Sequence, residues 1–284
     1  MEIKQLLEFG IINIDKCSGP TSFSVSEFLK RDLGLRKTSH FGTLDPKVTG
    51  ILPVALNRAC KLTGFFLGED KEYIGVMRLH EEVSLEKIEK AIKEKFLGKI
   101  KQTPPVRSRV KREEREREIK AFEILEKEGQ NFLFRVTCQG GTYIRKLVDD
   151  LGNELGIGAH MLELRRIRAG IFTEEKKYPC VSLYDFEKAV SEHEKGNSEK
   201  LEKMIIPAEK ALKEIFREVQ VKKDVVNFLY TGKRFLHESV LTKGKFETGE
   251  IVCAFAGELF IGVYEVINSE IIFAQPLFVM QPVK

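Results

Sequence analysis

Apolar residues repeat along the chain with two different spacings, and each spacing predicts one type of secondary structure. An apolar residue at every third or fourth position predicts helices over residues 22–33, 85–96 and 144–155. Polar residues or glycines stand at the ends of these segments, where helices commonly begin and end. Strict alternation of apolar and polar residues over residues 132–138 instead predicts a strand. Helices and strands therefore alternate in this part of the chain.

The segment from Glu187 to Lys203 is the weakest for folding, because charged and small polar residues break the apolar periodicity there. We place a domain boundary near residues 190–215. Beyond it, short apolar runs predict strands separated by turns: IVCAFA, ELFIGVYEV and IIFA. The end of the chain is therefore expected to form a small β-rich domain.

The composition is that of a folded protein large enough for more than one domain. The chain has 284 residues, of which 42% are hydrophobic and 32% charged. The sequence shows neither a long uncharged apolar run nor a basic start followed by an apolar stretch, so we expect no membrane span and no secretory signal. The five cysteines lack the close spacing of zinc or redox motifs. We therefore expect a reduced, metal-free, cytoplasmic protein.

The small net charge of +4 is localised, although the whole chain holds 47 basic and 43 acidic residues. Residues 101–120 carry eight basic and four acidic side chains, which accounts for the entire surplus. A charged stretch of this kind is most often a solvated surface. The alternative is contact with nucleic acid, which a local basic surplus favours.

The sequence lacks common cofactor and metal motifs but contains one unusual loop. The sequence has no phosphate-binding loop, no dinucleotide fingerprint and no HExxH, so any reaction is expected to need no cofactor and no metal. Asp45 precedes Pro46 and lies between Gly42 and Gly50. Proline favours an extended conformation of the preceding residue, which holds this carboxylate on a preset loop. The alternative is an aspartate that only caps a turn.

Two further residues are candidates because of their positions in predicted elements. Tyr73 begins a predicted strand, where a tyrosine either packs half-buried or offers a ring for stacking. Arg145 follows a double glycine and lies in the first turn of a predicted helix. A cation there opposes the helix dipole, which indicates a partner such as a buried carboxylate. The alternative is an ordinary surface arginine.

Several segments, in order along the chain, resemble the TruB/dyskerin family of RNA pseudouridine synthases. They are DKCSGPTS from Asp15, HFGTLDPKVTGILPV from His40, KEYIGVMRLH from Lys71, TPPVRSRVKR from Thr103 and GGTYIRKLVDDLGNELGIGAHMLELRR from Gly140. The resemblance covers about residues 10–185. Agreement in sequence, order and spacing makes chance a poor explanation.

The resemblance implies an α+β fold in two domains. A catalytic domain with a mixed, mainly antiparallel sheet and flanking helices is expected over residues 10–205. A small β-rich pseudo-barrel of the PUA type is expected over residues 212–284, with residues 1–9 packing on it.

The resemblance also implies roles for individual residues. Asp45 would be the catalytic carboxylate, and Arg145 would pair with it. Tyr73 would stack on the target base and take part in proton transfer. Leu164 would line the base pocket, and His40 would occupy the space left by the flipped nucleotide.

The implied reaction converts uridine in RNA to pseudouridine. The glycosidic N–C bond breaks, the ring turns, and the ring rejoins the sugar through carbon. No redox change occurs, so no cofactor is required, in agreement with the missing motifs. The enzyme must flip the base out of its stack. Direct attack of Asp45 on the ribose carbon and a glycal intermediate both remain open.

Lys16 is expected to pack beneath the active-site cleft in a structural role.

Within the family, the features favour the archaeal type that works in box H/ACA ribonucleoproteins. There, a guide RNA selects uridines in rRNA, and small accessory proteins help place the substrate. The basic segment would contact the RNA backbone through Arg107, Arg109, Lys111 and Arg112. A stand-alone enzyme acting on the T-loop uridine of tRNA is the alternative within the class. An RNA-binding scaffold without catalysis is the alternative from another class.

Three residues depart from the pattern that the family usually shows. Cys17 replaces a proline, and Ser39 and Phe41 replace a glycine and a small hydroxyl residue. We expect these changes to affect the conformation of the loop rather than the role of Asp45. A bulky Phe41 next to His40 is expected to alter how the base is displaced.

Overall fold

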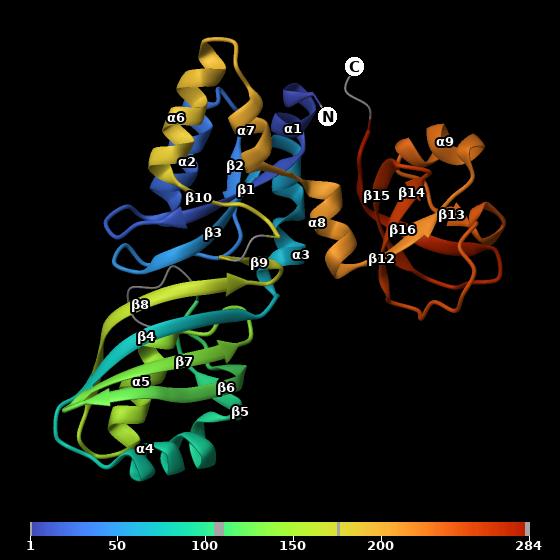
Figure 1. Ribbon diagram of the computed structural model, residues 1–284. Coiled ribbons are helices and arrows are strands. Elements are labelled where there is room, and N and C mark those ends of the chain that lie inside the picture. Colours follow the sequence, from blue (N-terminus) through green and yellow to red (C-terminus); the bar gives the residue numbers. More distant parts are fainter. Residues whose placement is uncertain (1, 105–110, 175–176, 282–284) are drawn as a thin grey trace. The chain divides into compact units, whose positions relative to one another are not determined.

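The structure is a computed structural model that describes residues 2–104, 111–174 and 177–281 (Figure 1). The chain divides into two compact units, Met1–Ile206 and Pro207–Lys284. This division lies within residues 190–215, where the apolar periodicity is interrupted. No helix in the described ranges is long and apolar enough to cross a membrane.

The first unit is built on one mixed sheet, to which the described residues contribute eleven strands. They are β1 (Gly10–Lys16), β2 (Thr38–His40), β3 (Thr49–Leu56), β4 (Lys71–Leu79), β5 (Gly98–Gln102), β6 (Arg115–Glu128), β7 (Asn131–Cys138), β8 (Ala159–Ala169), β9 (Phe172–Thr173), β10 (Cys180–Ser182) and β11 (Ile205–Pro207). The main path runs β10-β1-β3-β8-β4-β7-β6-β5, and β2, β9 and β11 pair with β3, β8 and β1. Only β10-β1 and β3-β8 are parallel along this path. The predicted mixed, mainly antiparallel sheet is confirmed.

Helices flank this sheet (Figure 1). They are α1 (Ile3–Glu8), α2 (Ser22–Asp32), the 3₁₀ helix η1 (Asn57–Leu62), α3 (Thr63–Leu67), α4 (Leu85–Ala91), the π turn η2 (Ile92–Phe96), α5 (Ile144–Glu154), α6 (Leu183–Glu194) and α7 (Glu199–Met204). Helices α2 and α6 lie side by side, and the rings of Phe28 and Phe186 meet edge to face at 5.9 Å. Residues 1–9 were expected to pack on the second domain, but Leu6 of α1 belongs to the core of the first unit.

The apolar periodicities identify most of these elements. Segments 22–33 and 144–155 form α2 and α5, and segment 132–138 forms β7, as predicted. Segment 85–96 is helical throughout but changes from α4 to a π turn at Ile92. In α5 the apolar positions form one buried face, while its charged residues lie on the other side.

The segment from Glu187 to Lys203, expected to fold poorly, forms most of α6 and α7. The hydroxyl of Ser182 accepts a hydrogen bond from the Asp185 N–H at 3.0 Å and caps α6. Phe186 of α6 and Leu201 of α7 are fully buried. Tertiary packing of a few apolar residues therefore overrides the high local polarity.

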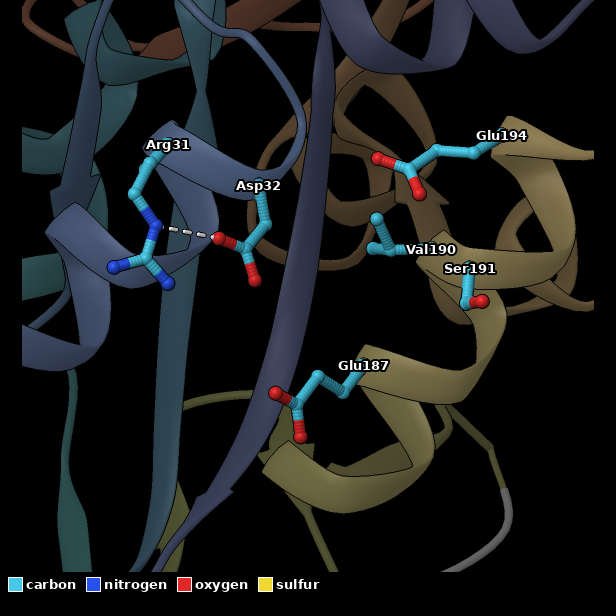
Figure 2. Close-up of a pocket in the computed structure, with 6 residues that line it drawn as sticks. All are labelled: Arg31, Asp32, Glu187, Val190, Ser191 and Glu194. Carbon is cyan, nitrogen blue, oxygen red and sulfur yellow. Dashed lines mark hydrogen bonds and ion pairs between the residues drawn. The ribbon is translucent and has the colours of Figure 1, made fainter.

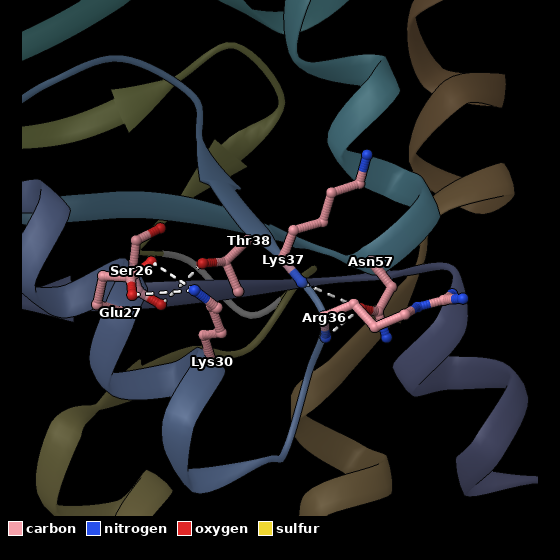
Figure 3. Close-up of polar contacts among 7 residues, drawn as sticks. All are labelled: Ser26, Glu27, Lys30, Arg36, Lys37, Thr38 and Asn57. Carbon is pink, nitrogen blue, oxygen red and sulfur yellow. Dashed lines mark hydrogen bonds and ion pairs between the residues drawn. The ribbon is translucent and has the colours of Figure 1, made fainter.

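A side-chain amide anchors the link between α2 and the strand that precedes the Asp45 loop (Figure 3). Asn57 has a positive φ of 44° and is 7% exposed. Its Oδ1 accepts hydrogen bonds from the backbone N–H groups of Arg36, at 3.0 Å, and Lys37, at 3.4 Å. The hydroxyl of Thr38 donates to the Ser26 carbonyl at 2.9 Å. These contacts fix β2 against α2 and η1.

The second unit is a small β-rich fold, as predicted. Its elements are α8 (Ala208–Ile215), β12 (Arg217–Gln220), η3 (Lys223–Val225), α9 (Val226–Tyr230), β13 (Phe235–Leu236), η4 (His237–Ser239), β14 (Ile251–Ala256), β15 (Leu259–Val266) and β16 (Ile272–Val279). The described strands form one sheet in the order β12-β14-β15-β16-β13. Tyr264 and Phe235 pack edge to face at 4.8 Å inside its core.

Phe41 has a packing role that its position next to His40 does not reveal. Its side chain is 1% exposed. The ring stacks on Phe66 with a centroid distance of 4.6 Å and an interplanar angle of 8°, and lies 6.0 Å from Phe172. This aromatic cluster supports the start of the Asp45 loop from within the core.

We expect Phe41→Ser to lower the free energy of unfolding by about 3–5 kcal/mol, because it empties a large buried site and places a hydroxyl there. Chemical denaturation measures the change. The matched control is Phe23→Ser, since the Phe23 ring is 66% exposed and its loss should matter little. Equal denaturation midpoints for the two variants would contradict the packing role.

Candidate active site

The loop between β2 and β3 presents Asp45 at the surface and buries one apolar residue on each side of it. Leu44 and Val48 are buried, whereas the Asp45 side chain is 53% exposed. The Ser22 hydroxyl on α2 accepts from the Leu44 N–H at 2.7 Å and donates to the Leu44 carbonyl at 3.0 Å. The Asp45 carbonyl accepts from the Val48 N–H at 3.0 Å, which closes a turn. Anchors on both sides therefore fix the carboxylate.

Arg145 is the partner of Asp45. Its Nη1 lies 3.0 Å from Oδ2 of Asp45, although the two residues are 100 positions apart. Arg145 stands in the first turn of α5, where a cation needs a compensating anion. The side chains are 67% and 53% exposed, so the partner is a solvent-accessible carboxylate rather than the buried one expected. An RNA substrate can reach such a pair.

Two residues outside the predicted site determine where α5 begins. A Cβ at Gly140 would lie 2.3 Å from the Leu67 carbonyl oxygen, so only glycine fits there. Gln102, 3% exposed at the end of β5, accepts from the Tyr143 N–H at 3.0 Å and donates to the Tyr143 carbonyl at 3.2 Å. Gln102 has no local signature in the sequence, because it acts on a residue 41 positions away.

Tyr73 and Leu164 lie on neighbouring strands and are nearly buried. Tyr73 on β4 is 7% exposed, and Leu164 on β8 is 8% exposed. Burial raises the pKa of Tyr73, and the nearby guanidinium of Arg166 opposes that rise. Gly75 lies opposite Leu164, and a Cβ at this glycine would stand 3.0 Å from Leu164 Cδ1. These side chains therefore pack in the core rather than line an open pocket.

His40, the last residue of β2, lies at the start of the loop. Its Nε2 is 3.2 Å from the Thr43 hydroxyl. Burial lowers the pKa of His40, and the charge of Arg166 lowers it further. The ring is therefore neutral at physiological pH.

The basic segment is partly neutralised by its own neighbours. Arg107 and Arg109 lie outside the described residues. Lys111 pairs with Glu113, and Arg112 Nε donates to the Pro104 carbonyl at 3.3 Å. Lys101 of β5 forms an ion pair with Glu114, the residue before β6, at 3.2 Å. These acidic partners lie within residues 101–120 and are already counted there, so the local surplus of basic residues is unchanged.

Three buried cations lie around the Asp45 loop, and the sequence predicted a role for only one of them, Lys16. Lys16, Lys71 and Arg166 are 0%, 4% and 1% exposed, and none forms an ion pair with a described carboxylate. All three donate to backbone carbonyl oxygens. Lys16 donates to Cys17 at 2.8 Å and Pro46 at 3.0 Å, and Arg166 donates to Ile51 at 2.8 Å and Gly42 at 2.9 Å. Lys71 donates to Phe66 at 3.2 Å, Leu67 at 3.2 Å and Glu69 at 2.6 Å. Apart from a hydrogen bond between Arg166 and Tyr73, these partners are main-chain atoms, so a pattern of side chains could not reveal them.

A pocket between α2 and α6 includes none of the predicted site residues (Figure 2). It is lined by Arg31, Asp32, Glu187, Val190, Ser191 and Glu194. Arg31 already pairs with Asp32 at 2.8 Å. Within the described ranges, no group of three or more His, Cys, Asp or Glu side chains could hold a metal ion. The Asp45 loop remains the candidate site.

Comparison with known families assigns the chain. Residues 30–144 match the TruB family pseudouridylate synthase (N terminal domain), and residues 145–213 match the tRNA pseudouridylate synthase B C-terminal domain. The chain belongs to the TruB family. It is therefore an RNA pseudouridine synthase, an isomerase of uridine, and the predicted family and activity are confirmed.

Archaeal relatives resemble this TruB-family chain over most of its length. A probable tRNA pseudouridine synthase B of Methanopyrus kandleri is 42% identical over 255 residues, covering 89% of this chain and 74% of the relative. Another with the same description, from Methanocaldococcus jannaschii, is 42% identical over 280 residues, covering 95% and 82%.

Solved structures extend the similarity to both units. A crystal structure of a Cbf5-Nop10-Gar1 complex matches with a TM-score of 0.89 at 36% identity, covering 99% of this chain and 88% of the other. An H/ACA RNP bound to a substrate RNA containing 2′-deoxyuridine matches with a TM-score of 0.88 at 34% identity, covering 99% and 88%.

Lys71 gives this TruB-family protein a pH-dependent stability. Burial, with the charge of Arg166, lowers the pKa of Lys71 from 10.5 to about 8. Between these values the unfolded chain binds more protons than the folded protein, so stability rises with pH in this window. We expect the wild type to gain roughly 3 kcal/mol relative to Lys71→Met between pH 7 and pH 11, at about 1.4 kcal/mol for each pKa unit.

Urea denaturation of both proteins across this pH range measures the difference. The exposed Lys93 provides the control, because the stability difference between the wild type and Lys93→Met should not change with pH. A flat difference for Lys71→Met as well would show that the Lys71 pKa is not lowered.

Proposed function

We propose that this enzyme isomerises uridines selected by a box H/ACA guide RNA, in the cytoplasm and together with small accessory proteins. The observation that supports this is the match of 99% of the chain to Cbf5 in a Cbf5-Nop10-Gar1 complex, with a TM-score of 0.89. A second match is to an H/ACA RNP that carries a substrate RNA. Similarity across both units favours a function in which both take part.

Asp45 is proposed as the catalytic carboxylate. Its exposed position lets it reach a nucleotide, and Arg145 at 3.0 Å holds and orients the carboxylate. An ionised carboxylate can either attack the ribose carbon or remove a ribose proton once the glycosidic bond weakens. In both cases the bond between ribose C1′ and uracil N1 breaks, the ring turns, and a new bond forms between C1′ and C5. C5 then loses its proton while N1 gains one, and Asp45 is either released from C1′ or gives the ribose proton back. Electrons and atoms balance within the substrate, so the reaction consumes no co-reactant.

Tyr73, Leu164 and His40 are proposed as supports for the flipped base. Tyr73 and Leu164 provide apolar surface, and neutral His40 provides a polar edge next to the loop. Because Tyr73 is 7% exposed, a base can stack on its ring only after covering side chains move. Binding of RNA is therefore expected to rearrange the surface of the site.

The second unit, Pro207–Lys284, is proposed as a PUA domain that holds the guide RNA, and the first as the catalytic domain. The small five-stranded fold of the second unit is consistent with this role.

Stand-alone modification of the tRNA T-loop is the second candidate. The archaeal relatives described above are named as probable tRNA pseudouridine synthases B, which favours it. The two candidates differ in which molecule selects the uridine.

We expect pseudouridine in a guided target RNA when guide and accessory proteins are present, and much less in bare tRNA. Mapping of pseudouridine after both incubations measures this, with Asp45→Asn as the inactive control. Equal modification of bare tRNA would favour the stand-alone enzyme. If Asp45→Asn modifies RNA as well as the wild type does, Asp45 is not catalytic, and no product in either assay would favour the scaffold.

The basic segment is proposed to contact RNA phosphates. We expect neutralisation of Arg107, Arg109, Lys111 and Arg112 to weaken RNA binding and to flatten its dependence on salt. With fewer phosphate contacts, binding releases fewer counterions from the RNA. Binding titrations from about 50 to 300 mM salt measure the slope. An unchanged slope would assign these residues to an ordinary solvated surface.

A further inference from the structure

Arg166 holds both ends of the loop that carries Asp45. Its Nε donates to the Ile51 carbonyl at 2.8 Å, and its Nη2 donates to the Gly42 carbonyl at 2.9 Å. The segment between these two residues contains Asp45. A guanidinium is planar and rigid, so one group fixes the distance between two backbone points, which a flexible ammonium cannot do.

The backbone around Arg166 is shaped for this close approach. Gly42 and Gly50, near the two ends of the loop, have φ of +104° and +100°, which favour glycine. A Cβ at Gly42 would lie 3.3 Å from Arg166 Nη1, and a Cβ at Gly50 would lie 2.1 Å from the Arg166 carbonyl oxygen. Both glycines are therefore needed where the loop meets Arg166.

Arg166 is also a permanent charge in the middle of the candidate site. It is 1% exposed, and it lies opposite Tyr73 in the β4–β8 register. Its charge lowers the pKa values of His40 and Lys71, both of which burial already lowers. Burying a charge without an ion-pair partner is unfavourable for stability, and an apolar residue would pack at lower cost. Such a residue therefore indicates a functional requirement.

We propose that Arg166 is a positioning residue for pseudouridine formation, which fixes the Asp45 loop at both ends and aligns it over Tyr73. This inference rests on the proposed role of Asp45. Arg166 does not touch the reacting atoms. It acts through the backbone carbonyls of Gly42 and Ile51, which set where the Asp45 carboxylate meets Arg145.

The test compares Arg166→Lys, Arg166→Gln and the control Arg165→Met. Lysine keeps the charge but cannot hold two carbonyls in a fixed plane, and glutamine removes the charge. Arg165 is next to Arg166 on β8 but pairs with Asp15 and Glu174, so its loss leaves the loop intact. We measure kcat, KM and Tm for each variant with an RNA that the wild type modifies.

A positioning role predicts that kcat falls by about 100-fold or more in both Arg166 variants, while KM stays within about threefold. Arg165→Met should keep the wild-type kcat. NMR titration of His40, which needs no substrate, should give a raised His40 pKa in Arg166→Gln but not in Arg166→Lys. A folded Arg166→Lys with wild-type kcat, or losses that only follow the folded fraction, would overturn the proposal.

A second pair of variants covers the case in which Arg166 variants do not fold. Gly42→Ala keeps Arg166 but places a methyl group against its guanidinium, whereas Gly196→Ala has similar backbone strain, with φ of +93°, and no atom within 4 Å of the new Cβ. We expect a loss of kcat only in Gly42→Ala. Equal kcat in the two variants would contradict the proposal. An inactive wild type would instead refute the proposed function, and the His40 titration would still test the placement of Arg166.

Discussion

Buried cations that bind backbone carbonyls hold the Asp45 loop, and the arrangement of the candidate site depends on this contact. Hydrophobic packing is not directional, so it could bury Leu44 and Val48 without fixing where Asp45 points. Hydrogen bonds from Lys16 and Arg166 are directional, and in a buried environment they are strong. The cost of burying these charges is therefore balanced by a loop with one defined conformation. The Phe41 cluster adds the apolar part of the support.

The order of strands in the sheet makes this contact possible. Strand β8 lies between β3 and β4, although both precede it by a long stretch of sequence that includes β5, β6, β7 and α5. Its parallel pairing with β3 places Arg166 opposite Gly50, and its antiparallel pairing with β4 places Arg166 opposite Tyr73. One residue thus touches the loop and the neighbouring site strand together. The helix α5, which packs on β8, brings Arg145 to the same place.

Charge is distributed in two layers at the site. The Asp45–Arg145 pair is exposed and accessible to RNA, while the cations beneath it are shielded from solvent and salt. The exposed pair can exchange partners when a nucleotide enters, whereas the lower layer stays in place. The net charge of the chain does not reveal this arrangement, because it is a sum over all residues, whether buried or exposed.

The sequence by itself determined the family and the main elements, and it named Asp45 and Arg145, which the structure brings together. Apolar periodicity is a local property, so it predicted α2, α5 and β7, and the unfavourable position of Arg145 at a helix start correctly indicated a carboxylate partner. The prediction from apolar periodicity was wrong for residues 187–203, where packing of a few buried side chains stabilises helices in spite of many polar residues. Only the tertiary structure revealed the contacts of Arg166, Gln102 and Phe41, because their partners are backbone groups or side chains that the fold brings close. Contacts of that kind leave no periodic trace in a sequence, since any residue can supply the carbonyl.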